Sequence, residues 1–355
     1  MYLHKSIIWL KIIEDTKRAG LAYINQGENN MEIPHALREV LEQQLTGSHH
    51  KQILSDAQTI SMRYRTQKGK GERLLTSDTE ALAYAAARMP ATFGAVSTAL
   101  SHALAVSGCK PQTLLDVGAG TGAASWAAES MLPLKSIACL EREDAMIKTG
   151  ELLMRQGPQA LRKARWIRFD LSLENIPERA DMVIASYVLN EMTDAGRARA
   201  LQKLWDAAEM MLLIVEPGTP AGFSHIMEAR QALLQRGAHI AAACPHEAVC
   251  QKASADWCHF TCRVSRSRLH RQLKGGEAPY EDEKFSYIAL TREKCCCYGA
   301  RILRHPQVHS GHVTLEICTP DGVRNVKLSK RDGDVYKRAR KAKTGDMIGL
   351  DGEKP

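Results

Sequence analysis

The sequence predicts an α/β fold whose core is a doubly wound parallel β-sheet. Between residues 109 and 220, short apolar runs of strand length alternate with segments of helical character. The first run ends in a glycine-rich turn, Gly118–Gly122, and a helical stretch follows it. Buried parallel strands separated by helices are typical of such a sheet. A helical region precedes this core, and a cysteine-rich insertion and a small basic region with β-structure follow.

The N-terminal part is expected to contain an extension and a helical region. We expect residues 1–30 to form a disordered extension, because Met31 opens a segment that reads like the natural start of a protein. The helical region then covers residues 31–108, where apolar residues such as Leu37 and Leu41 recur at helical spacing.

Within the helical region, capping residues around Ser77 predict a helix that ends near Pro90, because proline disfavours a helix interior. A second helix is expected from Ala91 to Val106. The stretch Lys68–Gly71 alternates lysine and glycine and predicts a loop between the helical parts.

The core, residues 109–293, is expected to contain strands that alternate with helices and two later strands that complete the sheet. The expected ranges are Thr113–Val117, Ile137–Leu140, Arg165–Phe169, Asp181–Ser186, Met211–Val215, His239–Ala243 and Phe285–Leu290. The cysteine-rich segment, residues 244–275, then forms an insertion between the last two strands.

The last part, residues 294–355, changes character. Val313–Cys318 alternates like a strand, Thr319–Gly322 carries a turn signal, and Val323–Leu328 returns as a second strand. Lysine and arginine are frequent beyond this hairpin, so we expect a β-containing basic region.

The glycine-rich turn predicts a ligand pocket at the C-terminal ends of the strands, where open α/β sheets bind their ligands. Glycine lets the backbone approach a ligand closely. Glu141 ends the second strand, where a carboxylate can hold ribose hydroxyls, and Asp170 ends the third, near the expected position of an adenine. The expected cofactor-binding residues are Asp116, Gly118, Gly120, Gly122, Glu141 and Asp170.

This pattern closely resembles class I S-adenosylmethionine-dependent methyltransferases, whose fold is Rossmann-like. The resemblance implies S-adenosyl-L-methionine as a cofactor, and a Rossmann-like core without a ligand is the alternative. No catalytic residue is assigned, because the Asn/Asp-Pro-Pro-aromatic motif of amino-methylating nucleic-acid enzymes and a nucleophilic cysteine are both absent after the fourth strand. The segment after the fourth strand instead contains Tyr187, Asn190 and Glu191. Each of them can contact a substrate, but Tyr187 can equally pack in the core and Asn190 can cap a helix.

Four cysteines, with the spacing Cys-x5-Cys-x7-Cys-x59-Cys, form a candidate metal site: Cys244, Cys250, Cys258 and Cys318. The Cys-x2-Cys pairs of zinc ribbons are missing. Wide, irregular spacing slightly favours an iron–sulfur cubane, which accepts thiolates from separate loops. Zinc stays the alternative, with His246, His259 and His270 as further donors.

The other cysteines compete with these four. Cys109 and Cys139 fall in the core and are expected to be buried small hydrophobes. The run Cys295–Cys297 can supply one ligand, because alternate side chains of an extended chain face opposite ways. Ten cysteines without a signal peptide indicate a reducing compartment.

The chain resembles the methyltransferase-like proteins of the small ribosomal subunit, the Rsm22 family, over about residues 31–346. Asp256–Phe260 and Tyr280–Tyr287 are the most specific matching blocks, and Arg88–Thr92 and Lys330–Gly333 also match. The resemblance implies a [4Fe-4S] cluster on Cys244, Cys250, Cys258 and Cys318, with residues 294–355 completing the site. It also implies a role in small-subunit assembly and translation.

Charge points to an RNA partner. Lysine and arginine exceed aspartate and glutamate by 48 − 40 = 8. Two basic runs, Arg263–Lys274 and Arg324–Lys343, would form one cationic surface for a phosphate backbone if a cluster joined Cys318 to the earlier cysteine loops. No apolar run reaches the roughly 18 residues of a membrane span, so we expect no membrane partner.

The leading interpretation is a monomeric factor that binds S-adenosylmethionine, holds a cluster and acts on the small ribosomal subunit and its rRNA. The alternative is an active rRNA methyltransferase with a structural cluster or zinc site. A radical enzyme is disfavoured, because the Cys-x3-Cys-x2-Cys triad is missing. We expect a bacterial cytoplasmic protein, with the mitochondrial matrix as the alternative.

Overall fold

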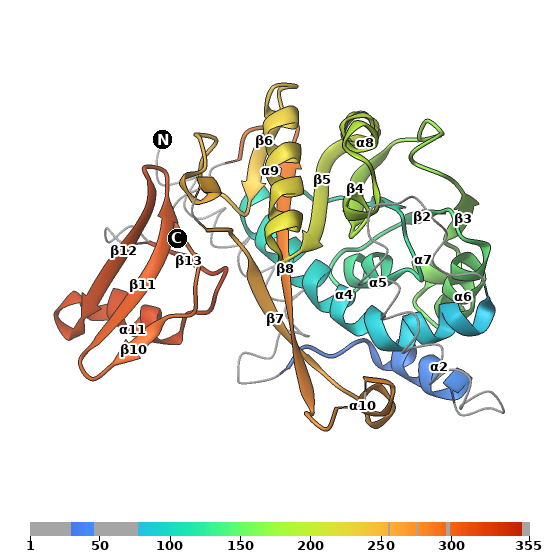
Figure 1. Ribbon diagram of the computed structural model, residues 1–355, viewed down its shortest axis with the longest axis horizontal. Coiled ribbons are helices and arrows are strands. Elements are labelled where there is room, and N and C mark those ends of the chain that lie inside the picture. Colours follow the sequence, from blue (N-terminus) through green and yellow to red (C-terminus); the bar gives the residue numbers. More distant parts are fainter. Residues whose placement is uncertain (1–29, 46–76, 255, 275, 296–298, 350–355) are drawn as a thin grey trace.

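The computed structural model describes residues 30–45, 77–254, 256–274, 276–295 and 299–349. An α/β body carries the central sheet, and a smaller β-rich unit from the C-terminal part lies beside it (Figure 1). The predicted extension, apart from its last residue, and the predicted loop Lys68–Gly71 lie outside the described residues.

The seven predicted strands are all present in the central sheet. They are β1 (Thr113–Val117), β2 (Ser136–Glu141), β3 (Arg165–Arg168), β4 (Ala180–Ser186), β5 (Ala208–Pro217), β6 (His239–Ala242) and β8 (Tyr280–Thr291). Their order is β3-β2-β1-β4-β5-β8-β6. The first five are parallel, but β8 runs antiparallel to both β5 and β6. The sheet is therefore mixed rather than wholly parallel, since a buried apolar run does not encode its own direction.

An eighth strand, β7 (Phe260–Ser265), pairs with the first half of β8 and was not predicted. Its alternate residues Phe260, Cys262 and Val264 are buried, a period-two pattern that the sequence did contain. The segment at Met31 joins this ribbon, because its N–H donates to the Arg263 carbonyl at 2.7 Å.

Helix α4 (Asp78–Ser107) is continuous through Pro90, so the prediction of two separate helices was wrong. The Ser77 hydroxyl caps the helix by accepting the Glu80 N–H at 3.2 Å. A proline in a helix interior costs about 3 kcal/mol. Buried packing of α4 against α5 (Ala123–Glu129), α6 (Asp144–Met154) and β8 outweighs that cost.

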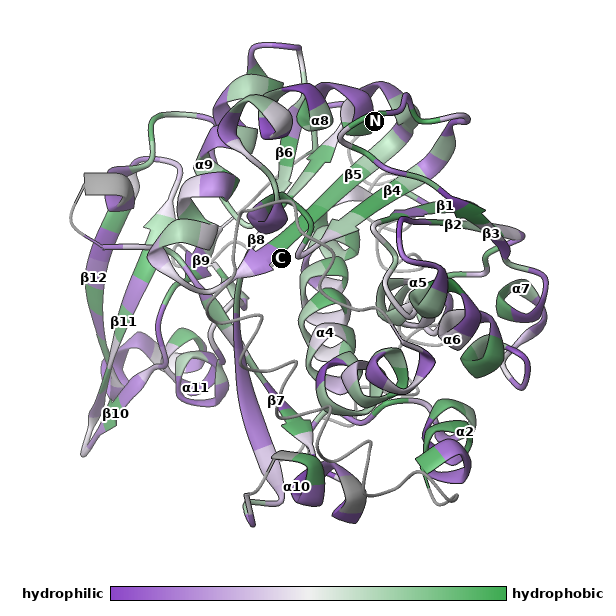
Figure 2. Cartoon of the chain, turned by 45° about the vertical axis from the view of Figure 1, so that its right-hand side comes forward, coloured by the Kyte–Doolittle hydropathy of each residue, from purple (hydrophilic) through white to green (hydrophobic). Residues whose placement is uncertain are grey.

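Two apolar cores cover the two faces of the sheet. One is formed with α2 (His35–Leu45), α4, α5 and α7 (Gln159–Arg162), and the other with α8 (Asp194–Ala207) and α9 (Pro220–Leu234). Figure 2 shows the strands between these helices as predominantly hydrophobic. Among the described helices, none combines the length and the apolar character that crossing a membrane requires.

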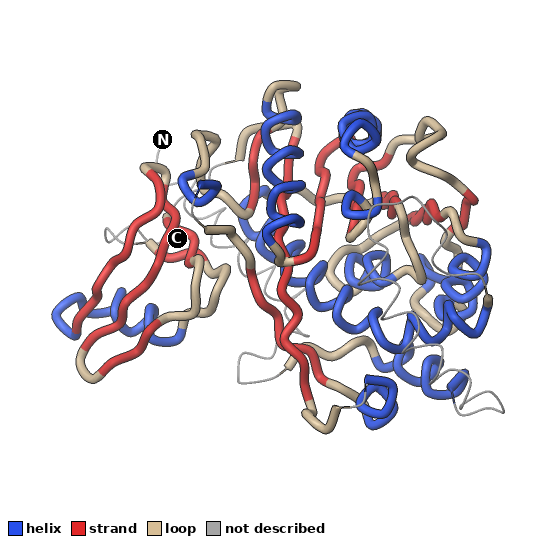
Figure 3. Tube along the Cα trace, viewed as in Figure 1, coloured by secondary structure: helices blue, strands red, loops and turns tan. Residues whose placement is uncertain are grey.

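The β-rich unit has its own small core. It contains β9 (Ala300–Ile302), β10 (Gln307–His309), β11 (His312–Thr319), β12 (Gly322–Ser329), η3 (Lys330–Asp332), α11 (Gly333–Lys341) and β13 (Met347–Ile348) (Figure 3). Val313, Leu315 and Ile317 of β11 pack against Tyr336 and Ala339 of α11. The predicted hairpin of two strands is confirmed as β11 and β12.

Candidate cofactor and metal sites

The glycine-rich turn joins β1 to α5 and is tied to the end of β2, because the Gly118 N–H donates to the Leu140 carbonyl at 2.8 Å. Gly118, Gly120 and Gly122 have φ angles of +69°, +57° and +88°, which favour glycine. A Cβ at Gly118 would come within 2.3 Å of Val188, and one at Gly122 within 2.4 Å of Met154. At Gly120 a Cβ would meet no atom of the described residues within 4 Å, so among them this glycine borders open space.

Glu141 stands beside that open space. Its Oε2 accepts the Gly120 N–H at 2.8 Å, and its Oε1 accepts the N–H groups of Arg142 and Glu143 at 2.7 and 2.9 Å. Burial raises the pKa of the carboxyl group, and the three N–H donors oppose that shift. A ribose that binds Glu141 would have to share or displace its contact with Gly120.

Asp116 lies underneath the turn rather than facing open space. Its side chain is fully buried, and its Oδ2 accepts both the N–H and the hydroxyl of Ser125, at 3.0 and 2.7 Å. This contact fastens β1 to α5. The second oxygen, Oδ1, has no hydrogen-bond partner among the described residues, and burial raises the pKa of Asp116 to about 7. A direct cofactor contact by Asp116 stays a prediction.

Asp170 follows β3 and organises the next turn, because its Oδ1 accepts the Ser172 N–H at 2.8 Å. It is partly exposed. Its predicted place near an adenine stays a prediction.

Beyond β4, Tyr187 is held in a strained conformation with φ +62°. Its hydroxyl donates to Glu283 Oε1 at 2.9 Å, and Arg88 Nη2 lies 3.2 Å from the same oxygen. Burial, together with nearby Glu141, raises the pKa of Glu191 to about 7. Sequence reasoning missed Glu283, whose partners come from α4 and the exit of β4.

The four predicted cysteine ligands come from separate elements, and their role as ligands stays a prediction. Cys244 follows β6, Cys250 precedes η2 (Gln251–Ser254), Cys258 precedes β7, and Cys318 lies on β11. In each of the six possible pairs, one thiol is close enough to raise the pKa of the other. Burial is the larger cause, and it raises the pKa of Cys318 to about 12.

Two arginines hold the cysteine loops and place positive charge beside the thiols. Arg301 of β9 is almost fully buried and donates to the carbonyls of Ala243 and Gly345, at 3.0 and 2.6 Å. Arg230 of α9 donates to the Ala248 carbonyl at 2.6 Å. Both cations oppose the effect of burial on the pKa of Cys244 and Cys318. Their role was not predicted, because their carbonyl partners are distant in sequence.

The three histidines proposed as zinc donors are dispersed. His246 Nε2 lies 3.4 Å from Cys318 Sγ, whereas His259 stacks on Trp257 with ring centroids 5.5 Å apart. His270 lies on α10 (Arg268–Lys274), 3.6 Å from Glu281. Within the described ranges, no three His, Cys, Asp or Glu side chains are arranged to hold a single metal ion.

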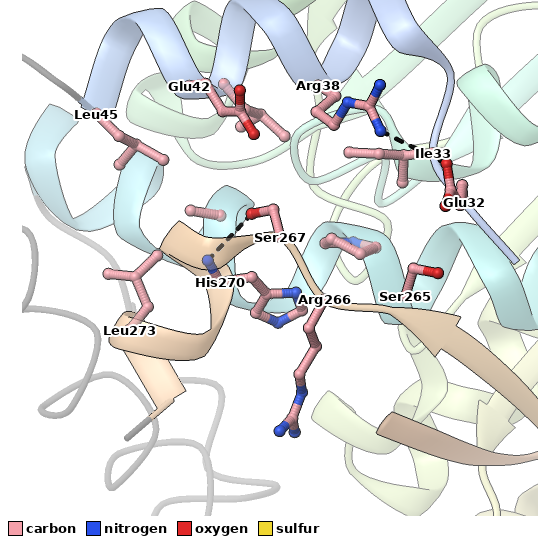
Figure 4. Close-up of a pocket in the computed structure, with 13 residues that line it drawn as sticks. Glu32, Ile33, Arg38, Glu42, Leu45, Ser265, Arg266, Ser267, His270 and Leu273 are labelled. Carbon is pink, nitrogen blue, oxygen red and sulfur yellow. Dashed lines mark hydrogen bonds and ion pairs between the residues drawn. The ribbon is translucent and has the colours of Figure 1, made fainter. Parts of the chain in front are cut away.

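His270 borders a separate cavity of about 130 Å³ between α2, α4 and α10. Figure 4 shows its apolar side chains, including Leu45 and Leu273, with Arg38 and Glu42 at the α2 side. The glycine turn and the four thiols are not among its lining residues.

The remaining described cysteines lie elsewhere. Cys139 is fully buried, 3.3 Å from Ser125 Oγ, whereas Cys109 is only partly buried, which corrects that prediction. Cys295 contacts the Thr291 hydroxyl at 3.2 Å and lies near Cys109. Cys296–Cys297 lie outside the described residues.

The two basic runs do not form one surface, so that expectation was wrong. Arg263 and Arg266 pair with Asp282 and Glu281 of β8, at 2.7 and 2.8 Å. Strand β7 carries this run away from the thiols to α10, which packs on α4. The second run lies on β12, η3 and α11, at the left of Figure 1, whereas α10 lies at the bottom centre.

Comparison with known proteins identifies the family. A family model described as mitochondrial small ribosomal subunit Rsm22 matches residues 78–349, most of the chain. The chain belongs to the Rsm22 family. A relative in Homo sapiens, "Ribosome assembly protein METTL17, mitochondrial", is 31% identical over 291 residues, which is 75% of this chain and 62% of the relative. "Rsm22-cox11 tandem protein 2, mitochondrial" of Schizosaccharomyces pombe is 25% identical over 343 residues, 81% of this chain and 45% of the relative.

This Rsm22 family chain thus spans less than two thirds of the length of these relatives. Similar solved structures include the magnesium protoporphyrin IX methyltransferase of Synechocystis (13% identity, 73% of this chain and 98% of that chain, TM-score 0.40). A putative RNA methyltransferase of Pyrococcus horikoshii is 16% identical and covers 54% of this chain and 79% of its own, with a TM-score of 0.36. The class I methyltransferase fold follows from the strand order itself, and the family model confirms the resemblance found in the sequence.

Proposed function

We propose that this chain is a methyltransferase-like assembly factor of the small ribosomal subunit that holds a [4Fe-4S] cluster and S-adenosylmethionine. The observation that carries the proposal is that four thiols from separate loops and β11 influence one another's pKa values, in a chain of the Rsm22 family. One relative is named as a ribosome assembly protein.

We propose a cluster rather than a single zinc ion at these thiols. All four donors are thiols from separate elements that influence one another's pKa values. A cubane accepts thiolates that are further apart. Arg230 and Arg301 would offset part of the negative charge. When bound, the cluster would cross-link the β-rich unit to the α/β body through Cys318.

S-adenosylmethionine is proposed to bind at the C-terminal edge of β1 and β2. Gly120 borders open space there, and Glu141 stands next to it. Because glycine has no side chain, a ligand can approach the backbone of Gly120 closely.

The proposed macromolecular partner is small-subunit rRNA. Residues 322–343 contain nine basic and two acidic side chains, and therefore supply +7 of the formal net charge of +8. Such a surface suits a phosphate backbone. The relatives are mitochondrial proteins, which favours the mitochondrial matrix over the bacterial cytoplasm that we expected. The chain is proposed to act as a monomer.

A second candidate function is methyl transfer to that RNA. Two observations favour it: Tyr187 is fixed by Glu283 next to the glycine turn, and the pKa of Glu191 is raised to about 7. A carboxylate with such a pKa can accept a proton from an acceptor group near neutral pH. Transfer of a labelled methyl group to small-subunit RNA, compared between the native chain and Glu191→Gln, tests this function.

The test of the main proposal is anaerobic purification followed by iron, sulfide and zinc analysis. We expect about four irons and four sulfides per chain, and loss of both in Cys258→Ser and Cys318→Ser. Cys109→Ser is the matched control and should keep them, because Cys109 lies with Cys295. Stoichiometric zinc without sulfide would overturn the cluster, and retention of iron in Cys318→Ser would reassign the fourth ligand.

A further inference from the structure

The hairpin of β10 and β11 ends in two stacked imidazole rings. His309 and His312 are directly opposed across the strands, with ring centroids 4.7 Å apart and planes inclined by 16°. Strand β10 is exposed along its whole length, and Val308 beside the pair is 47% exposed. An aromatic stack at the end of an exposed strand can present a flat ring face to a ligand.

The chemistry of the pair suits a neutral aromatic partner. Partial dehydration, together with Lys327 and His309 nearby, lowers the pKa of His312. This shift favours the uncharged form of the His312 ring. A neutral imidazole can stack on the π-face of a nucleobase, as aromatic side chains do in proteins that bind single-stranded RNA.

The surroundings supply the contacts that such a base would need. The pairing register places Gln307, His309, His312, Thr314 and Lys327 on one face of the sheet, because directly opposed residues point to the same side. The buried residues Val313 and Leu315 face the other way, toward α11. The face is polar, carries a cation and is flanked by the basic run of β12 and η3.

We infer that the His309–His312 pair is a stacking platform for a base of single-stranded RNA, with Lys327 beside it to contact the adjoining phosphate. The inference rests on the proposed rRNA binding and deepens it: the ligand is an unpaired nucleotide rather than a duplex. An unpaired base has an accessible π-face, whereas the bases of an A-form helix are stacked on each other.

The test compares the full chain on two fluorescent oligoribonucleotides of the same length, one of adenosines and one of abasic residues, with a chelator present. We expect the double variant His309→Ala/His312→Ala to bind the adenosine strand about ten-fold more weakly, the loss typical of one stacked base. Its affinity for the abasic strand should be unchanged. The variant His309→Phe/His312→Phe should keep the native affinity, since stacking and not an imidazole nitrogen is required.

The variant Lys330→Ser/Arg331→Ser is the charge control, and its affinity for both strands should fall by the same factor. Unchanged melting temperature and iron content show that the histidine variants fold. If the native chain binds neither strand, the proposed RNA binding itself fails. Two results would overturn the stacking platform while leaving RNA binding intact, provided that the native chain binds both strands. One is an alanine variant whose affinity for the adenosine strand equals that of the native chain, and the other is a phenylalanine variant that loses affinity for this strand.

Discussion

Alanine substitutions at Gly118 and Gly120 should separate the structural from the ligand-binding role of the glycine turn. Both residues have left-handed backbones, so any side chain there costs about 1–2 kcal/mol. At Gly118 the new Cβ would also lie 2.3 Å from Val188, and relieving such overpacking costs about 1–3 kcal/mol more. Gly118→Ala should therefore destabilise the chain by about 2–5 kcal/mol, and Gly120→Ala by about 1–2 kcal/mol.

For ligand affinity we expect the specific effect at Gly120 rather than at Gly118. At Gly120 the Cβ meets no atom within 4 Å in the part of the chain that the structure describes, and the space it enters is the one proposed for S-adenosylmethionine. Calorimetry should show an affinity at least about ten-fold weaker for Gly120→Ala, which corresponds to about 1.4 kcal/mol. Urea unfolding measures the stability of both variants. Equal destabilisation by the two variants, or native ligand affinity in Gly120→Ala, would refute the reasoning.

Two further predictions concern buried charges. Burial raises the pKa of Asp116 in the folded chain to about 7, whereas in the unfolded chain this carboxyl group loses its proton above about pH 4. The folded chain therefore binds one more proton between these pH values, and the contribution of Asp116 to stability falls as the pH rises from about 4 to about 7. Replacement by Asn should remove this dependence, so the stability of the variant relative to the native chain should be higher at pH 8 than at pH 5, and a constant difference would contradict the assignment. Arg301→Leu leaves the carbonyls of Ala243 and Gly345 without their hydrogen-bond donor, so it should lower the free energy of unfolding by about 2–5 kcal/mol and reduce the iron content. Arg236→Leu removes an exposed ion pair and should lower the free energy of unfolding by less than about 1 kcal/mol. Melting temperatures and iron content distinguish these outcomes, and equal effects of the two arginine variants would be contrary to this account.

The strands of the central sheet were predictable because each is a short apolar run bounded by turn residues. The direction of each strand was not predictable, so β8 was expected to be parallel to its neighbours but is antiparallel. The continuity of α4 through Pro90 was hidden because tertiary packing, not local propensity, decides it. Strand β7 was not predicted, although Phe260, Cys262 and Val264 alternate with polar residues along its six residues.

The candidate sites were predictable to the extent that single residues carry them. The four cysteines and the glycine turn stand out in sequence, and the four thiols influence one another's pKa values in the structure, but their roles as ligands stay predictions. Long-range partners were not predictable: Glu283 meets Tyr187, and Arg301 reaches the Ala243 carbonyl, only because of the fold. The expected joint basic surface failed because β7 carries Arg263 away and Asp282 neutralises it.

The central claim is that the cluster site and its basic unit, rather than the methyl-donor pocket, attach this chain to the small ribosomal subunit. Co-sedimentation with small subunits tests it most directly, with Cys258→Ser compared against Gly120→Arg. The account predicts that Gly120→Arg, which fills the open space of the pocket, stays bound, whereas Cys258→Ser dissociates because Cys318 and the basic β-rich unit are no longer held. Dissociation of the pocket variant with retention of the cysteine variant would contradict the assembly function and favour an active methyltransferase.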